Sequence, residues 1–438
     1  MTAAYVEEFT ELSRNGASAE PAWLRETRRA GIEKFAELGF PTPRNEDWHF
    51  TSVAPIAESV FSPLRGTSGE IDGSALDPFI FAQRDWPLVV FVNGRYDARL
   101  SSFGALAEGV RVTDLASAMR NEPALVEPWL GKLSPLDGRS FSALNAAFMS
   151  DGAVIHIAPD TEAPVPLHVI FVSDSSAAKG VAHLRNLIVA GSHSKATVSE
   201  SYVSLGDSHY FTNAVTEVKV DAGATLAHYK IQRESERAFH VHTIDAQQAR
   251  DSHYVSFSFA TGAALSRTNI YTNLDGEGCG ATLNGLYMAD GEQHMDHQTN
   301  IVHAQPNCFS REIYKGILSG SAHGVFNGKV YVYPIAQKTD GKQTNNNLLL
   351  SEHARIDTKP QLEIFADDVR CTHGATVGRL DEMALFYMKS RGVSADRATR
   401  LLTYAFAADV LETIEVEAVR TELERATLER FTGASAAE

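Results

Sequence analysis

The runs LHVIFVSD (167–174), NLIVAG (186–191) and ATVSESYVSL (196–205) show the pattern that decides the fold of this chain. Each is short and rich in β-branched and aromatic residues, and apolar positions tend to recur every second residue, which is typical of β-strands. Similar runs extend on both sides: LVVFVNG (88–94), AVIHIAP (153–159), AVTEVKV (214–220), HYVSFSFA (253–260), TNIYTNL (268–274), KVYVYP (329–334) and QLEIFA (361–366). The region from about residue 87 to residue 371 is therefore predicted to be β-rich.

Clusters of small residues interrupt these runs at irregular intervals, so no strict sequence repeat can be identified. They are GSHSKA (191–196), DAGAT (221–225), TGAA (261–264), GEGCGAT (276–282) and SGSAHG (319–324). A β-sandwich and a parallel β-helix both suit many short strands with such turns. Asn-Gly hairpin signals are scarce and the region is long for one sandwich, which favours the β-helix, over residues 87–376.

Helical patterns lie at both ends of the chain. Apolar residues recur at helical spacing over 22–38, with an interruption at Gly31 and a stop at Gly39. The proline-containing segment 40–53 is expected to be an ordered loop pinned by Trp48 and Phe50, and a Gly- and Ser-rich linker follows over 62–74. Residues 1–86 are thus predicted to form an N-terminal helical domain with its linker.

Residues 377–438 are predicted to form a C-terminal helical domain. A helix over 381–391 ends at Gly392, and Ser394 is positioned to cap a longer helical stretch over 395–431. This stretch carries an apolar stripe made of Leu401, Leu402, Phe406, Val410, Leu411 and Ile414. Such a stripe forms either intramolecular core or a docking surface for a partner.

Composition limits the partners and the compartment. The 438-residue chain has a formal charge of -16 and no long Lys/Arg cluster, so neither nucleic acid nor an anionic membrane is an expected partner. The start of the sequence lacks the apolar core of a signal peptide, and no apolar run approaches the length of a membrane span. We expect a cytoplasmic protein whose three cysteines, Cys279, Cys308 and Cys371, are reduced thiols.

Motifs for catalysis or nucleotide binding are missing from the sequence. The segment GVFNGKV (324–330) has the wrong glycine spacing for a P-loop and no Ser or Thr after Lys329, so this chain is not expected to hydrolyse ATP. The patterns HVH (240–242) and HMDH (294–297) contain metal-ligand residue types, and His240 and His242 would share one face of a strand. Solvent-facing or hydrogen-bonded strand histidines are nevertheless the better interpretation, because no second ligand cluster accompanies either pattern.

The strongest local pair is Cys371 with His373, in the stretch DDVRCTHGATVGR (367–379). Residues two apart in an extended segment point to the same side, so a thiol and an imidazole could together hold a soft metal or a sulfur species, with Asp367 and Asp368 nearby. On spacing alone, a structural cysteine beside a surface histidine is the simpler interpretation.

Longer stretches around this pair resemble a known family. The span from Thr339 to Val410, which contains CTHGATVG (371–378), is closely similar to the C-terminal core of the SufB/SufD family of iron-sulfur cluster assembly proteins. The form of this motif resembles the SufD branch, since SufB subunits tend to carry glutamate at the position of Gly374. The segment FPTPRNEDWHFTSV (40–53) also resembles the entry segment of that branch.

This resemblance implies a right-handed parallel β-helix flanked by helical domains, acting as a non-catalytic scaffold subunit of the SUF system. It implies pairing with SufB, two copies of the ATPase SufC docked on the C-terminal helices, and a nascent cluster built at the SufB interface. His373 matches a histidine used there, and Cys371 is a second candidate ligand. The stripe residues Leu401, Leu402, Phe406, Val410 and Leu411 become candidates for the ATPase contact.

Further expectations and alternatives accompany this interpretation. The isolated chain is expected to hold no tight cofactor, to carry iron or an iron-sulfur cluster only transiently within the complex, and to form a homodimer without its partners. One alternative is a solenoid enzyme acting on a carbohydrate or acyl substrate, although no convincing carboxylate or histidine constellation supports it. Another is a purely structural adaptor whose partner holds all the chemistry.

Overall fold

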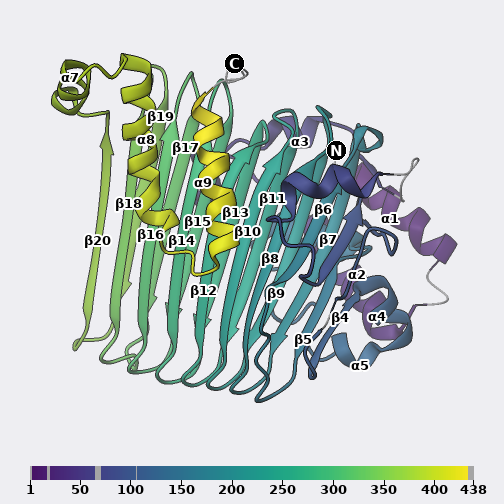
Figure 1. Cartoon of the computed structure of the whole chain (residues 1–438). Coiled ribbons are helices and arrows are strands. Elements are labelled where there is room, and N and C mark those ends of the chain that lie inside the picture. Colours follow the sequence, from purple (N-terminus) through teal and green to yellow (C-terminus); the bar gives the residue numbers. More distant parts are fainter. Residues whose placement is uncertain (1, 17–19, 65–70, 105, 433–438) are drawn as a thin grey trace.

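Two ten-stranded β-sheets dominate the computed structural model, which describes residues 2–16, 20–64, 71–104 and 106–432 (Figure 1). In the first sheet the order is β19 (Arg355–Ile364), β17 (His323–Val332), β15 (His294–His303), β13 (Leu265–Leu274), β11 (Phe239–Gln248), β9 (Phe211–Val220), β7 (Gly180–Ala190), β5 (Ala153–Ile157) and β4 (Val110–Asp114), with β1 (Ser62–Pro63) beside β7. In the second sheet it is β20 (Arg370–Gly378), β18 (Asp340–Leu349), β16 (Phe309–Leu318), β14 (Gly280–Ala289), β12 (His253–Gly262), β10 (Thr225–Glu234), β8 (Lys195–Ser204), β6 (Leu167–Ser173), β2 (Leu88–Val92) and β3 (Arg95–Tyr96).

Successive strands alternate between the two sheets, so the chain winds as a parallel β-solenoid. Phe211 pairs with Phe239, and Phe239 pairs with Leu265, at separations of 28 and 26 residues. The separation differs from coil to coil because the connecting turns differ in length, which is why no strict repeat is visible in the sequence. The predicted parallel β-helix with helical flanks is confirmed.

The interior between the two sheets is filled by every second residue of each strand. Val218, Ile244 and Ile270 from the first sheet share one buried cluster with Leu226 and Tyr254 from the second. Burying one large aliphatic side chain contributes about 1.5–3 kcal/mol, so this repeated layer is the main stabilising element of the solenoid. At the TGAA turn, Gly262 has φ 88°, and a Cβ there would lie 2.1 Å from the Glu234 carbonyl oxygen.

Helices cover the outer face of the first sheet near its N-terminal end. These elements are α1 (Thr2–Gly16), α2 (Ala22–Leu38), η1 (Glu46–Trp48), α3 (Ala54–Glu58), α4 (Leu115–Asn121), α5 (Pro123–Val126) and α6 (Ser140–Phe148), of which α2 and α6 pack closely together. By contrast, η2 (Gly73–Phe79) packs on the second sheet, and η3 (Ser175–Ala177) lies in the connection between β6 and β7. Helix α2 continues through Gly31, where an added Cβ would lie 2.7 Å from the Ala147 nitrogen. Gly31 therefore permits close helix packing. The predicted interruption of the helix at Gly31 is wrong.

The ordered loop 40–53 is held by different side chains from those expected. Trp48 does contribute, since the Arg267 guanidinium carbon lies 3.6 Å from the centre of its ring. Phe50 is exposed, whereas Thr51 is fully buried and its hydroxyl lies 2.9 Å from His294 Nε2 and 2.6 Å from Asp296 Oδ2. Part of the predicted 62–74 linker, residues 65–70, lies outside the described residues.

Three C-terminal helices follow β20: α7 (Glu382–Ser390), α8 (Ala395–Leu411) and α9 (Glu417–Thr432). The predicted cap is present, because Ser394 Oγ accepts a hydrogen bond from Arg397 N at 3.3 Å. Helices α8 and α9 lie across the outer face of the second sheet, while α7 lies at the corner beside β20 (Figure 1). No helix in the described ranges is both long enough and apolar enough to cross a membrane.

Candidate functional site

The site predicted around Cys371 lies at the open end of the solenoid. Strands β19 and β20 are the last members of their sheets, and no strand among the described residues pairs with their outer edges (Figure 1). The residues of both strands are half-buried or exposed, unlike those of the preceding coils. An unpaired strand edge presents free backbone donors and acceptors, which is suited to pairing with another protein.

Strand β20 places Cys371 and His373 on its inward-facing side. Cys371 pairs with Gly341 and His373 pairs with Gln343 of β18, which both point into the solenoid. Because alternate residues of a strand share a face, the thiol and the imidazole lie on the same side, as the spacing predicts. His373 is exposed and Cys371 is half-buried, so the imidazole is the more accessible of the two donors.

The surroundings of Cys371 are mainly apolar. It packs beside a cluster formed by Val330, Val332, Ala336 and Ala366 at the end of the solenoid. Burial raises the pKa of the Cys371 thiol, and the nearby carboxylate of Asp340 acts in the same direction. A thiol with a raised pKa stays protonated at neutral pH and is a poorer metal ligand than a thiolate.

A polar row leads from the buried interior to His373. Glu312, Gln343 and His373 occupy the same register position in three successive strands, β16, β18 and β20. Gln343 Nε2 donates to Glu312 Oε2 at 2.7 Å, and burial raises the pKa of Glu312 to about 7. Gln343 Oε1 is buried without a hydrogen-bond partner among the described residues.

The two nearby aspartates have other surroundings. Asp368 forms an ion pair with Lys338 across the turn, and its backbone nitrogen donates to Gln337 Oε1 at 2.9 Å. Asp367 is exposed in the same turn, before β20 begins. The described residues contain no group of three or more His, Cys, Asp or Glu side chains that could hold a metal ion. Cys371 and His373 therefore supply at most a partial ligand set.

The other histidine patterns are used in packing. His240 and His242 share the inward face of β11, as expected, and are fully buried: His240 Nδ1 lies 2.7 Å from Glu234, and His242 Nε2 lies 3.0 Å from the Thr216 hydroxyl. Burial lowers the pKa of both. In HMDH, the two histidines separate, because His294 faces outward toward Thr51 while His297 stacks on Tyr287 inside the solenoid.

Sequence reasoning missed a charged cluster in the solenoid interior. Glu200, His228 and Lys230 are fully buried there, with His228 Nε2 3.2 Å from Glu200 and Lys230 Nζ donating to Thr268 at 3.1 Å. Burial lowers the pKa of Lys230 to about 7. The sequence HYKIQRE (228–234) has a polar residue at every second position, which could have indicated a polar strand face. The neighbouring strand that supplies Glu200 could not be identified without the register between coils.

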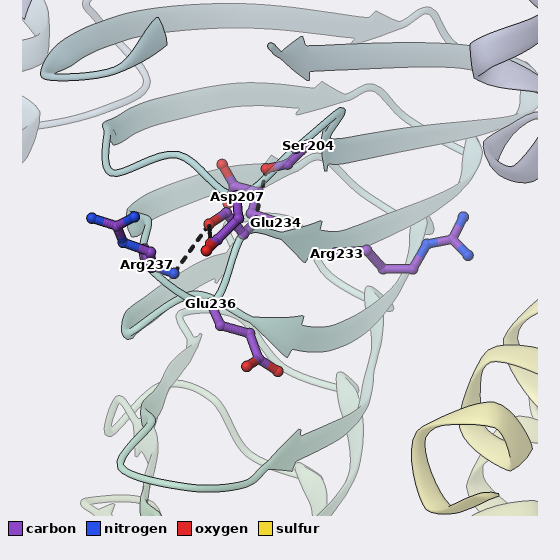
Figure 2. A pocket seen from close by; sticks show the side chains of 8 residues that line it. Ser204, Asp207, Arg233, Glu234, Glu236 and Arg237 are labelled. Carbon is purple, nitrogen blue, oxygen red and sulfur yellow. Dashed lines mark hydrogen bonds between the residues drawn. The ribbon is translucent and has the colours of Figure 1, made fainter. Parts of the chain in front are cut away.

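A small hollow lies where β8 and β10 end (Figure 2). Its polar groups satisfy one another, since Ser235 donates to Asp207 at 2.8 Å and accepts from Arg237 N at 3.1 Å. The side chain of Arg233 points away from the hollow and forms an ion pair with Glu422 of α9 at 2.6 Å. The hydrogen bonds of Ser235 and Asp207 thus hold this hollow as an ordered turn.

The five predicted docking residues divide into two groups. Val410 and Leu411 are fully buried against the second sheet with Phe257, Phe259 and Leu286, so they form intramolecular core. This corrects their assignment to a partner surface, because the outer face of the sheet is itself apolar and requires a cover. Phe406 and Leu402 are half-buried, and Leu401 is 42% exposed.

Helix α7 carries exposed apolar residues that were not selected from the sequence. Met383, Phe386 and Tyr387 are 73%, 68% and 58% exposed, and no residue of α7 is buried. With Leu401 they make up the α7–α8 apolar surface, a concentration of large exposed side chains typical of an interaction site.

Comparisons with known proteins agree along almost the whole chain. Residues 171–406 match the family described as "SUF system FeS cluster assembly, SufBD core domain", and residues 1–169 match the "SufBD protein N-terminal region". The chain is 33% identical to the iron-sulfur cluster assembly protein SufD of Escherichia coli, over 90% of this chain and 89% of that protein. It is 29% identical to SufD of Bacillus subtilis, over 96% and 95% of the two chains.

A third relative, the SufBD family protein slr0076 of Synechocystis, is 31% identical over 93% of this chain and 91% of its own. Matches of this extent cover the N-terminal helices, the solenoid and most of helix α8. The family models and the parallel β-solenoid thus converge on one conclusion: the chain belongs to the SufD group of the SufB/SufD family of SUF-system iron-sulfur cluster assembly proteins.

Proposed function

We propose that this chain is a non-catalytic scaffold subunit that supplies one half of a cluster-building site. The observation that carries the proposal is the position of Cys371 and His373 on the inward face of β20, at a solenoid end whose strand edges are unpaired in the described structure. Iron in such clusters is tetrahedrally coordinated by several ligands, and this chain offers two. The remaining donors come from a second subunit.

The partner at this end is SufB, a member of the same family. Its terminal strands would continue the two sheets across β19 and β20, so that backbone hydrogen bonds form the contact and the inward faces meet. The nascent cluster is then the cargo of the interface and not a resident cofactor of this chain. A homodimer through the same edge is the expected state of the chain without SufB.

His373 is the principal ligand in this proposal. A neutral imidazole can replace one thiolate on cluster iron, and an exposed ring reaches the interface without rearrangement. Cys371 is the weaker candidate because its thiol is favoured over the thiolate. Gln343, held by Glu312, lies next to His373 in register and is suited to orient the ring.

The α7–α8 apolar surface is the proposed contact for the ATPase SufC. Met383, Phe386, Tyr387 and Leu401 are exposed beside the solenoid end, so an ATP-driven movement of the bound subunit would act close to the cluster site. Because the sequence of this chain lacks a P-loop, ATP hydrolysis is assigned to that partner. The complex is expected to work in the cytoplasm.

Co-expression tests the proposal directly. A tagged copy of this chain should co-purify with SufB and two copies of SufC, and the complex should carry iron and sulfide after anaerobic reconstitution. The isolated chain, reconstituted in the same way, should retain far less iron because its ligand set is incomplete. A chain that assembles a stable cluster alone, or that binds neither partner, would overturn the proposal.

A further inference from the structure

A cavity of about 960 Å³ lies at the opposite end of the molecule from Cys371, among α1, α2, α4, α6 and β7. This volume is in the range of small-molecule binding sites. Its floor is apolar and buried, and is formed by Leu24, Met119, Ala147, Phe148, Met149 and Val181. The proposed scaffold function does not use this cavity.

Arginines surround the apolar floor. Arg25, Arg28, Arg29, Arg95 and Arg120 line the cavity, whereas Glu20 is the one acidic side chain that lines it among the described residues. Such a concentration of positive charge is unexpected in a chain with a formal charge of -16. Arg28 pairs with Glu20 and Arg29 with Glu33, but arginines still outnumber acidic side chains among the described lining residues. A positively charged rim around an apolar hollow favours a ligand of opposite charge.

Two of the lining arginines, Arg28 and Arg95, are half-buried and are held by backbone carbonyls. Arg28 is half-buried, with Nη1 donating to the Ala147 carbonyl at 3.1 Å and with Glu20 3.2 Å away. Arg95 Nη1 donates to the Ser150 carbonyl at 3.4 Å. Burial, reinforced by the charge of Arg95, lowers the pKa of Arg28, although Glu20 partly opposes this. A bound anion would relieve the repulsion between the two guanidinium groups.

The floor also contains an unused polar atom. His183 is 3% exposed and stacks on Phe148, with ring centres 5.4 Å apart. Its Nδ1 lies 3.2 Å from Asn213 Nδ2, whereas its Nε2 is buried without a hydrogen-bond partner among the described residues. A buried polar atom without a partner is uncommon, and His183 lines the cavity.

We propose that this cavity binds an anionic amphiphile, a molecule with an apolar body and a single carboxylate or phosphate head. The apolar body lies on the floor between α2, α4 and α6, and the head contacts the arginines at the rim. Arginine binds carboxylate and phosphate in a planar, bidentate way, so either head satisfies the same groups.

Isothermal titration calorimetry of the full chain tests the proposal with four probes below their micellar concentrations. Dodecanoate and dodecyl phosphate differ in the head, dodecanol has no charge, and inorganic phosphate has no apolar body. We expect saturable binding of one or both acids, at least about tenfold weaker binding of dodecanol, and weaker binding of the acids at high salt. The relative affinity of the two acids identifies the head.

Two variants and a control connect the binding to the cavity. The double variant Arg29→Gln/Arg120→Gln changes exposed rim residues and should weaken dodecanoate binding about tenfold or more, with little change in stability. Ala116→Trp should block the cavity, and its thermal unfolding reports whether the fold is intact. Arg44→Gln, an exposed arginine outside the lining, should bind as the unchanged chain does. Equal binding of dodecanol and dodecanoate, binding unaffected by the rim variant, or no saturable binding would each overturn the proposal.

Discussion

His373 lies beside Gln343 in the register of β20 and β18, and Gln343 is in turn hydrogen-bonded to the buried Glu312 at 2.7 Å. His373 thus lies next in register to a hydrogen-bonded pair of polar side chains in the interior of the solenoid. This relationship determines how the proposed ligand can be tested separately from the scaffold that carries it.

Replacing His373 by alanine should slow cluster formation in the reconstituted complex by at least about tenfold, because one iron ligand is lost. The side chain is exposed, so thermal stability and co-purification with the partners should not change. Iron and sulfide content and the absorbance of the assembled cluster measure the effect. His353→Ala, also exposed, is the matched control.

The same experiment distinguishes a structural adaptor from a ligand-bearing subunit. An adaptor would retain the normal assembly rate in His373→Ala, and the ligand assignment would then be wrong. Gln343→Leu should give a smaller loss than His373→Ala, since it removes the polar neighbour proposed to orient the ring and leaves the ligand in place. Normal assembly rates in both variants would support the purely structural adaptor.

Charged substitutions on the α7–α8 apolar surface should remove the ATPase subunit from the complex. Phe386→Asp and Leu401→Asp should each weaken this contact by about 2 kcal/mol or more if they are central to it. Co-purification and stimulated ATPase activity measure the loss. Leu428→Asp on α9, which is similarly exposed at 40%, is the control and should leave the contact intact.

Glu312→Gln should stabilise the chain at alkaline pH. Burial raises the pKa of Glu312 to about 7 from its ordinary value of 4.5, so the folded state binds its proton more tightly than the unfolded state does. The stability that Glu312 contributes is fully present below about pH 4.5 and is lost as the pH rises through 7. The variant lacks this loss and should be more stable at pH 8 by up to about 3 kcal/mol.

Urea unfolding of both proteins from pH 4.5 to pH 8.5 measures this effect as the difference between the two curves. Lys230, whose pKa is lowered to about 7, makes the protein gain stability as the pH rises above that value. Both proteins contain Lys230, so its contribution cancels in the difference. A difference that does not grow between pH 4.5 and pH 7.5 would contradict the assigned ionisation of Glu312.

Leu411→Ala should destabilise the chain itself by about 2–5 kcal/mol, since it leaves a cavity between α8 and the second sheet. Leu401→Ala, on the exposed side of the same helix, should change the free energy of unfolding by less than about 0.5 kcal/mol. Chemical denaturation checks both. Deleting the chain after Ser394 would expose this apolar sheet face, so point variants of exposed residues are the better test of partner binding.

Local sequence was sufficient for much of the fold. The alternation of β-branched and aromatic residues predicted the strands, scarce hairpin signals favoured a solenoid, and Ser394 indicated where α8 begins. These predictions succeeded because strand period and helix capping depend on neighbours in the chain. Gly31 was misinterpreted, because its role depends on contact with Ala147, more than a hundred residues away.

The candidate site was only partly predictable. Spacing placed Cys371 and His373 on one side of a strand, but not at the open end of the solenoid and not beside Gln343. The cluster of Glu200, His228 and Lys230 was missed because Glu200 lies on β8, one coil before the strand that carries His228 and Lys230. Irregular turn lengths hide which residues of successive coils meet, so these contacts follow from the coil register and not from sequence distance.

By itself, the sequence determined the β-rich solenoid, its helical flanks and the Cys371–His373 pair, since these depend on local period, capping and motif. The tertiary structure decided which apolar residues are core and which are surface. Val410 and Leu411 are covered because α8 lies on an apolar sheet face, whereas Phe386 on α7 has no such face beneath it. Helical spacing is the same in both helices, and only the packing of the whole chain distinguishes them.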